Sequence, residues 1–542
     1  MEHAGTTLRI GTGNWHFTNA PWQDGEQGEL LVPQDLRRQD GERIQGHHHA
    51  FALDQTYQDL QVSFEFRLTP HSDIGIVLRA RNERDFYLFH LPDCGQASRS
   101  QHFWAAFSKM DHTGYLKRIK LELVRRVPSV PREWMRAEIR LERNRLSARI
   151  GDHGVFEASD DTYPGPGRVG LYLTGNAQIR QVRVSGAPAS GPAWDPQTRQ
   201  PRNWTYPVPQ ERIWQKPQDL VRLPGGEVLL SYTLQASTGT TTDEQGSQLL
   251  VRSTDGGRSW SAPEALQVVA GPVQAWWPPR LHHTPAGRLI ALLRGESGYA
   301  IAESTDGARS WAAPVPTNIP LGVPMVEKLH LGPQAALNLA DGSMVLLLYG
   351  GYALGDLHGP WTWGSAHCQA YSVRSSDEGR TWSAPINVDN QGLDREGKAV
   401  PGNLDLTEVC AAQMSDGGIL ALVRPIFSPW MWETWSRDGG ATWGPCVPGA
   451  FPGYATPNML RTRSGAVLVA HRLPSLSLNL SHDEGHTWDQ GTLIDSGLWC
   501  MGAMVEVEPD VVLYVYWDSY ESLMRAQRLR VTASGLEPLP PG

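Results

Sequence analysis

The stretch Arg252–Trp260, RSTDGGRSW, decides the fold of most of this chain because the same cassette returns four more times. The other copies read ESTDGARSW, RSSDEGRTW, WSRDGGATW and LSHDEGHTW, and they begin at Glu303, Arg374, Trp435 and Leu480. Each copy has the composition of a turn. Aspartate accepts hydrogen bonds from the turn backbone, glycine adopts positive φ, and tryptophan buries its ring against a neighbouring sheet. The chain therefore contains one structural unit used several times.

Each cassette closes a longer repeat that begins with an apolar run. The run EVLLSYTL precedes the first cassette and follows the turn LPGGE, and similar runs precede the other four. The repeat is thus strand, glycine or aspartate turn, strand, cassette, and it returns after roughly 45 to 70 residues, as repeat units of this kind do. Repeats of this size with loops of unequal length are typical of a β-propeller, so we expect an all-β fold.

The cassettes match the Asp-box pattern, and through them the chain resembles the sialidase superfamily of six-bladed β-propellers. The resemblance places this propeller at residues 205–542 and implies a sixth blade without a cassette. The stretch MVEVEPDVVLYVYWD, residues 504–518, would supply its strands. The segment after residue 204 would close the ring.

Residues 1–187 carry a different pattern. The runs LQVSFEFRLTP (60–70) and IRQVRVSG (179–186) alternate apolar and polar side chains, as half-buried strands do. The order of these runs resembles that of concanavalin-like or laminin-G-like jelly rolls, which implies an N-terminal β-sandwich. Residues 188–204 are rich in proline, glycine and alanine and predict a linker.

Composition narrows the possible partners and compartments. The formal net charge of −9 disfavours nucleic acid and anionic membranes as general partners. No apolar run is long enough to span a membrane, and the first residues do not read as a signal peptide, so we expect a cytoplasmic protein. A removed signal peptide would instead make it secreted or periplasmic. The five cysteines form no CxxC pair, and adjacent histidines in GHHHA (46–50) point to opposite faces of a strand. We expect no metal and no cofactor, and the oligomeric state stays open.

The starts of the inner strands are where a propeller presents chemistry. The sialidase resemblance implies three arginines that hold a substrate carboxylate, a tyrosine nucleophile paired with a glutamate, and an aspartate acid/base. Glu408, in LTEVCAAQM, matches the glutamate, and Arg424, sixteen residues later, matches one arginine. Arg472 ends the corresponding strand of the next repeat and matches another. A structural ion pair between adjacent strands is the alternative for Glu408 and Arg424.

The other family positions match less well. Asp243 precedes the first cassette and matches the acid/base aspartate. Gln215 stands where the first arginine belongs, with Lys216 beside it as a possible replacement charge, and Met501 stands near the position of the tyrosine. Without the tyrosine, Asp243 and Glu408 are candidates for an inverting pair, which requires carboxyl groups roughly 6.5–9.5 Å apart.

A lyase that acts on a uronic acid is a second possibility. It needs a base near the α-proton and a cation near the carboxylate. His282 or His283 could be the base, with Arg280 and His330 nearby in the sequence. Trp277 is a candidate for stacking on a sugar ring.

These residues together predict a sialidase-like, exo-acting glycoside hydrolase with a carbohydrate substrate. The substrate would be a terminal, acidic sugar bound at the mouth of the propeller channel. Two alternatives stay open: the lyase, and a non-catalytic propeller that binds glycans. The departures at Gln215 and Met501 favour the binding protein, whereas the retained Glu408 and Arg424 favour the enzyme.

Overall fold

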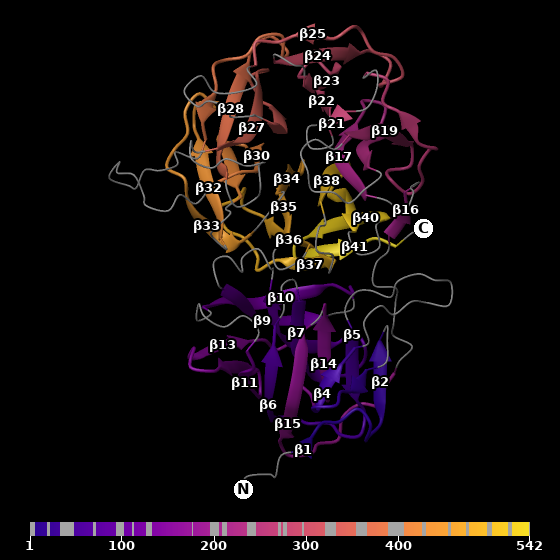
Figure 1. Cartoon of the computed structure of the whole chain (residues 1–542), viewed down its shortest axis with the longest axis vertical. Coiled ribbons are helices and arrows are strands. Elements are labelled where there is room, and N and C mark those ends of the chain that lie inside the picture. Colours follow the sequence, from indigo (N-terminus) through magenta and orange to yellow (C-terminus); the bar gives the residue numbers. More distant parts are fainter. Residues whose placement is uncertain are drawn as a thin grey trace. The chain divides into compact units, whose positions relative to one another are not determined.

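The computed structural model of the chain describes most of its 542 residues. The described ranges are 6–18, 22–32, 48–68, 72–93, 102–110, 113–125, 133–175, 177–195, 205–208, 214–235, 245–268, 273–274, 279–294, 298–319, 332–353, 366–388, 406–424, 430–453, 457–472, 476–495, 501–518 and 523–540. Every named element within these ranges is a β-strand, which confirms the predicted all-β class (Figure 1). Accordingly, no described helix is long and apolar enough to cross a membrane.

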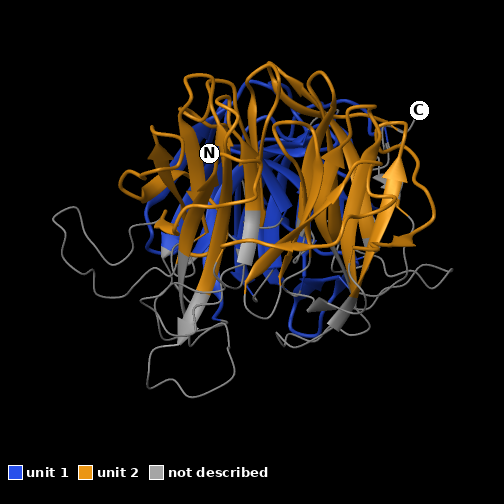
Figure 2. Cartoon of the chain, turned by 90° about the horizontal axis from the view of Figure 1, so that it is seen from above, with its two compact units in different colours: residues 1–203, 474–478, 490–498 blue, residues 204–473, 479–489, 499–542 orange. Residues whose placement is uncertain are grey.

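The chain divides into two compact units (Figure 2). Unit 1 comprises Met1–Asn203 with two short later segments, Pro474–Leu478 and Gln490–Leu498. Unit 2 contains the remainder, in the segments Trp204–Leu473, Asn479–Asp489 and Trp499–Gly542.

Unit 1 contains two antiparallel sheets. The first has the order β13-β12-β11-β6-β15-β4-β3, and β1 also pairs with β15. Its strands are β1 (Thr6–Thr7), β3 (Gln23–Asp24), β4 (Glu29–Leu31), β6 (Leu60–Arg67), β11 (Met135–Glu142), β12 (Arg145–Ile150), β13 (Val155–Ser159) and β15 (Gln178–Ser185). In the second sheet the order is β2-β5-β14-β7-β8-β9-β10. These strands are β2 (Trp15–Thr18), β5 (His48–Ala52), β7 (Ser72–Ala80), β8 (Phe86–Asp93), β9 (His102–Met110), β10 (Leu116–Arg125) and β14 (Arg168–Thr174).

The hydrophobic core of unit 1 follows from the alternation of its strands. Along β6, apolar side chains such as Val62 and Phe64 are buried, whereas the residues between them are half-exposed. They share one cluster with Ile76 and Phe89 of the second sheet. The two sheets therefore enclose a common core, and the jelly-roll connectivity stays a prediction. Strands β7 and β14 are buried along their whole length, so both faces of these two strands lie away from solvent.

Unit 2 is a β-propeller in which five separate sheets form blades. In four of them, four strands are paired in chain order. They are β17 (Trp214–Arg222), β18 (Val228–Gln235), β19 (Gln245–Ser253) and β20 (Glu264–Ala265); β22 (Arg280–His283), β23 (Leu289–Arg294), β24 (Tyr299–Ser304) and β25 (Val315–Pro316); β26 (Gly332–Asn338), β27 (Met344–Ala353), β28 (Ala366–Ser375) and β29 (Ile386–Asn387); and β30 (Val409–Gln413), β31 (Ile419–Val423), β32 (Trp430–Ser436) and β33 (Val447–Pro452). In the first blade, β21 (Val273–Gln274) also pairs with β19.

The fifth separate sheet joins residues from both ends of unit 2. Its order is β16-β40-β39-β38, with β41 on β40. The strands are β16 (Thr205–Pro207), β38 (Met501–Glu508), β39 (Val511–Asp518), β40 (Leu523–Thr532) and β41 (Gly535–Pro538). Within it, Thr205 lies opposite Gln527 in antiparallel register. Two further antiparallel pairs complete the strands, β34 (Asn458–Arg461) with β35 (Val467–Arg472) and β36 (Leu476–Ser481) with β37 (Thr492–Asp495).

The repeated cassettes are hydrogen-bonded turns. In the first, Ser253 Oγ donates to Asp255 Oδ1 over 2.8 Å and accepts the Gly257 N–H over 2.8 Å. The Ser259 N–H and hydroxyl both donate to Asp255, over 2.9 and 2.5 Å. Gly257 adopts a φ of +88°, which favours glycine, and a Cβ there would lie 2.5 Å from the end of the Leu513 side chain. The equivalent serine and aspartate make the same bond in the other four cassettes.

The tryptophans of the last four cassettes pack against the preceding sheet along the chain, whereas Trp260 of the first packs in a cluster with Leu513 of β39. Trp443, which follows β32, is buried in a cluster with Val345 and Leu347 of β27. Its Nε1–H donates to Ser372 Oγ of β28 over 2.9 Å, inside this buried region. Trp382 occupies the equivalent place against Ile290 and Leu292 of β23. The fourth cassette therefore ties its own blade to the blade before it.

Acid should weaken these turns. The Thr487 hydroxyl donates to Asp483 over 2.6 Å, and with the Thr487 N–H and the Ser481 hydroxyl it lowers the pKa of Asp483 to about 2, although partial burial opposes the shift. Because this folded-state value lies below the unfolded one of about 3.9, the stabilisation is complete above about pH 4 and is lost as the pH falls through about 2. We expect the difference in urea midpoint between the wild type and Thr487→Val to be widest near neutral pH and to shrink below about pH 3. A difference that is constant with pH would contradict this role for Asp483.

Candidate functional site

The channel of the propeller is a cavity lined by the first strands of its repeats. It is lined by residues of β17, β22, β26, β30, β34 and β38. Side-chain bonds join neighbouring strands around it: Asn338 Nδ2 of β26 donates to the His283 carbonyl of β22 over 2.8 Å, and Arg280 of β22 pairs with Asp219 of β17. A ligand in this channel would therefore meet contributions from several blades.

Glu408 and Arg424 form a buried ion pair at one end of β30 and β31. Arg424 Nη1 donates to Glu408 Oε2 over 2.8 Å, and the two residues are 5% and 1% exposed. The backbone sets this pair. Antiparallel bonding continues beyond the named strands, with the Arg424 N–H donating to the Glu408 carbonyl over 2.8 Å and the Thr407 N–H to the Arg424 carbonyl over 2.9 Å.

Arg472 occupies the corresponding strand end in the following repeat. It is the last residue of β35 and is only 7% exposed, although its strand is otherwise apolar and buried. Its neighbour His471 is held by Asn479 Oδ1 over 2.8 Å. Arg424 and Arg472 are thus two buried guanidinium groups at equivalent ends of second strands, each opposite the start of an inner strand.

The described residues proposed for a lyase, Arg280, His282 and His283, are each hydrogen-bonded to other protein groups. Arg280 Nε donates to Asp219 Oδ1 over 2.9 Å. His282 Nε2 lies 2.9 Å from Asn338 Oδ1, and His283 Nδ1 lies 3.2 Å from the Gly287 carbonyl oxygen. Burial lowers the pKa of His282, partly opposed by the Asn338 bond, and burial also lowers the pKa of His283. Both rings are therefore neutral at neutral pH. The His282 bond joins β22 to β26, and the His283 bond joins β22 to the turn that follows it.

Several residues singled out in the sequence lie outside the described part of the structure. These are Asp243, Trp277 and His330. Gln215 and Lys216 belong to β17 and Met501 begins β38, but only their strand positions are described. The distance from Asp243 to Glu408, and with it the choice between inverting and retaining geometry, stays a prediction.

Unit 1 contains a polar cluster that the sequence reading missed. His90 Nδ1 lies 2.7 Å from Asp73 Oδ2, and His90 Nε2 lies 2.9 Å from Ser108 Oγ. The Tyr172 hydroxyl donates to the same Asp73 oxygen over 3.3 Å. All four residues are buried, and they come from the neighbouring strands β7, β8, β9 and β14. The available signal was the presence of polar residues, such as His90 in FYLFHLPD, within mainly apolar strands. The carboxylate holds the ring proton on Nδ1, which leaves Nε2 as the basic nitrogen.

The described residues of the two units contain no evident metal centre. Among the residues that the structure describes, no three His, Cys, Asp or Glu side chains are grouped to hold a metal ion.

Comparison with known proteins finds one domain family and a set of similar folds. A family described as "3-keto-alpha-glucoside-1,2-lyase-like domain" matches residues 10–185, which lie in unit 1. No curated protein matches the sequence.

Similar solved structures include the Hadza microbial sialidase Hz136, at 13% identity and a TM-score of 0.47, covering 95% of this chain and 99% of that one. A mutant of the NanB sialidase from Streptococcus pneumoniae aligns at 12% identity and a TM-score of 0.43, covering 89% and 95%. A protein of unknown function from Dyadobacter fermentans aligns at 17% identity and a TM-score of 0.47, covering 60% and 97%. These values assign no activity or substrate to the chain.

Proposed function

We propose that this chain is a glycoside hydrolase that removes a terminal, acidic sugar at one mouth of the propeller channel. The observation that carries the proposal is the buried Glu408–Arg424 pair, with Arg472 buried at the equivalent strand end of the next repeat. Buried charges are costly unless they are paired, and buried arginine forks suit planar carboxylates. In this assignment Glu408 is the base, Asp243 the acid, and Arg424 and Arg472 hold the sugar carboxylate together with Lys216.

The same proposal includes a six-bladed ring. Strands β34 to β37 are assigned as the sixth blade, because β34 lines the channel together with the first strands of the five separate sheets. We also assign unit 1 as a jelly roll and residues 188–204 as the linker that precedes the propeller.

Turnover on a panel of sialosides, uronides and neutral glycosides tests this function. We expect wild-type activity on an acidic member and a loss of at least about 100-fold in Glu408→Gln, the scale of one lost acid/base group. Arg472→Gln should raise KM for the acidic sugar and leave neutral sugars unaffected. The matched control is Arg437→Gln, an exposed arginine of unit 2 that is paired with Asp416. Binding of a glycan without turnover of any panel member would favour the non-catalytic propeller instead.

A lyase is a second candidate, supported by the family match over residues 10–185, which belong to unit 1. A lyase of this kind removes the proton next to a ketone and expels the oxygen on the adjacent carbon, so it needs one positioned base. His90 is that base in this assignment, with Asp73 holding its tautomer. Adding a 3-keto-α-glucoside to the substrate panel tests which of the two units carries the lyase activity. Elimination that His90→Gln abolishes and Glu408→Gln leaves intact would place the lyase in unit 1, and the reverse pattern would place it in unit 2.

A further inference from the structure

One face of unit 1 carries a dense set of arginines. It is the outer face of β15, β6, β11, β12 and β13, opposite the hydrophobic core, and we call it the arginine face. Its arginines are Arg67, Arg136, Arg140, Arg145, Arg149, Arg180 and Arg183, and its acids are Glu65, Glu138, Glu142 and Glu157. Seven positive charges thus face four negative ones in a chain whose formal charge is −9. None of these cations is a lysine.

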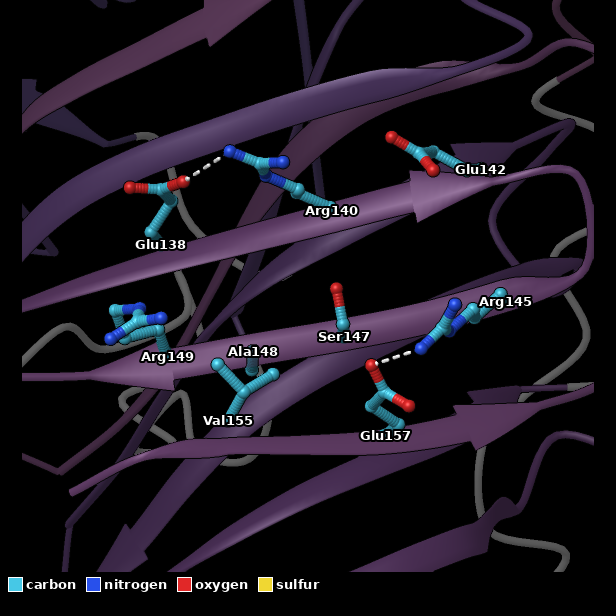
Figure 3. Close-up of a pocket in the computed structure, with 9 residues that line it drawn as sticks. All are labelled: Glu138, Arg140, Glu142, Arg145, Ser147, Ala148, Arg149, Val155 and Glu157. Carbon is cyan, nitrogen blue, oxygen red and sulfur yellow. Dashed lines mark hydrogen bonds and ion pairs between the residues drawn. The ribbon is translucent and has the colours of Figure 1, made fainter.

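Ion pairs on the arginine face leave part of it uncompensated. Arg145 pairs with Glu157, Arg140 with Glu138, and Arg180 with Glu65. Three exposed arginines, Arg136, Arg149 and Arg183, form no ion pair within the described ranges. Figure 3 shows a shallow hollow on β11, β12 and β13 in which the paired residues are joined and Arg149 stands apart.

The register of the strands places two of these unpaired arginines on one line across the arginine face. Arg183 of β15 lies opposite Ser63 of β6, Ser63 opposite Glu138 of β11, and Glu138 opposite Arg149 of β12. Arg183 and Arg149 therefore occupy one row that crosses four strands. Neighbouring strands are about 4.8 Å apart, so this row extends about 14 Å. Such a distance suits an extended ligand better than a single small anion.

The arginine face has few apolar or aromatic groups. Its tryptophan, Trp134, is covered by guanidinium groups, with Arg180 Cζ 3.9 Å and Arg67 Cζ 5.1 Å from the ring centroid. Base stacking on single-stranded nucleic acid needs open aromatic rings, and insertion into a membrane needs exposed apolar side chains. Val155, at 47% exposure, is the large exposed apolar residue on this face. Planar guanidinium forks without open rings favour carboxylate ligands.

We propose that the arginine face binds an anionic, carboxylated polysaccharide chain through Arg136, Arg149 and Arg183. This surface is distinct from the channel of unit 2 and goes beyond the proposed hydrolase. It would hold a polymer by several weak contacts, while the negative charge of the remaining chain limits binding of polyanions elsewhere.

Affinity electrophoresis of the full chain in gels containing polygalacturonate tests the proposal. We expect retardation of the wild type, and roughly tenfold weaker binding for Arg136→Gln/Arg149→Gln/Arg183→Gln, because each exposed contact contributes modestly and three are removed. Raising the salt from about 50 to 200 mM should weaken the wild type more than the triple variant. The control variant, Arg258→Gln/Arg309→Gln/Arg437→Gln, removes the same charge from exposed positions of unit 2 and should bind like the wild type.

Three results would overturn the arginine face as a polysaccharide site. They are unchanged binding by the triple variant, equal retardation by neutral dextran, and equal or tighter binding of duplex DNA. Turnover of a small soluble glycoside keeps the two proposals separate, because the triple variant should retain wild-type turnover. A chain that turns over no glycoside but still binds polygalacturonate through these arginines would support the arginine face and contradict the proposed hydrolase.

Discussion

Arg424→Met should lower the free energy of unfolding by about 3–5 kcal/mol, because it leaves the Glu408 carboxylate buried without its partner. The pair is 2.8 Å long and both side chains are almost fully buried, so water cannot replace the lost guanidinium. The shift should appear in urea unfolding followed by circular dichroism. We expect it throughout the pH range in which Glu408 is charged.

The double variant Arg424→Met/Glu408→Leu separates charge burial from packing. Replacing a whole buried pair by apolar residues is often neutral or stabilising, so this variant should unfold within about 1 kcal/mol of the wild type. If the double variant is as unstable as Arg424→Met alone, the pair stabilises the fold through its packing and not through its charges. Its glycosidase activity should still be lost, which distinguishes the catalytic part of Glu408 from its structural part.

Trp443→Ala should lower the free energy of unfolding by a similar amount, about 3–5 kcal/mol, because it removes a large buried ring and leaves a cavity. The ring lies in the cluster formed with β27 and donates to Ser372 of β28, so the loss would loosen the contact between two blades. Thermal unfolding by calorimetry measures this effect.

Trp443→Phe is the matched control for the ring itself. It keeps most of the buried aromatic surface and removes the bond to Ser372, so we expect about 1–3 kcal/mol, the range for a buried polar group left unpaired. Combining it with Ser372→Ala should restore part of that loss. An equal effect of the alanine and phenylalanine variants would mean that the hydrogen bond, and not the ring, holds the blades together.

Local patterns made the architecture of unit 2 predictable. A serine and an aspartate at fixed spacing, followed by one or two glycines, form the same hydrogen-bonded turn in each of the five cassettes. The predicted all-β propeller is confirmed on this basis. The number of blades depends instead on how the sheets pack against one another around the ring. A local sequence pattern does not determine this packing.

The candidate site was predictable where two residues share a hairpin. Glu408 and Arg424 are separated by one turn between β30 and β31, so their sequence spacing sets them opposite each other. The partners of Arg280 and His282, which are Asp219 and Asn338, lie 61 and 56 residues away on other strands. Contacts of this kind follow from tertiary packing, and for the same reason the Asp73–His90–Ser108 cluster had no sequence motif.

The pairing of β16 with β40 has a consequence for the order in which the protein is made. Thr205 begins unit 2, yet its partner Gln527 lies close to the end of the chain. During synthesis from the N-terminus, at about 5–20 residues per second, β16 must wait for more than three hundred residues before its partner leaves the ribosome. Unit 2 can therefore close only after β40 has been synthesised. A ribosome stalled before residue 523 would hold an open row of blades with an unpaired edge, the form most exposed to aggregation and to chaperones.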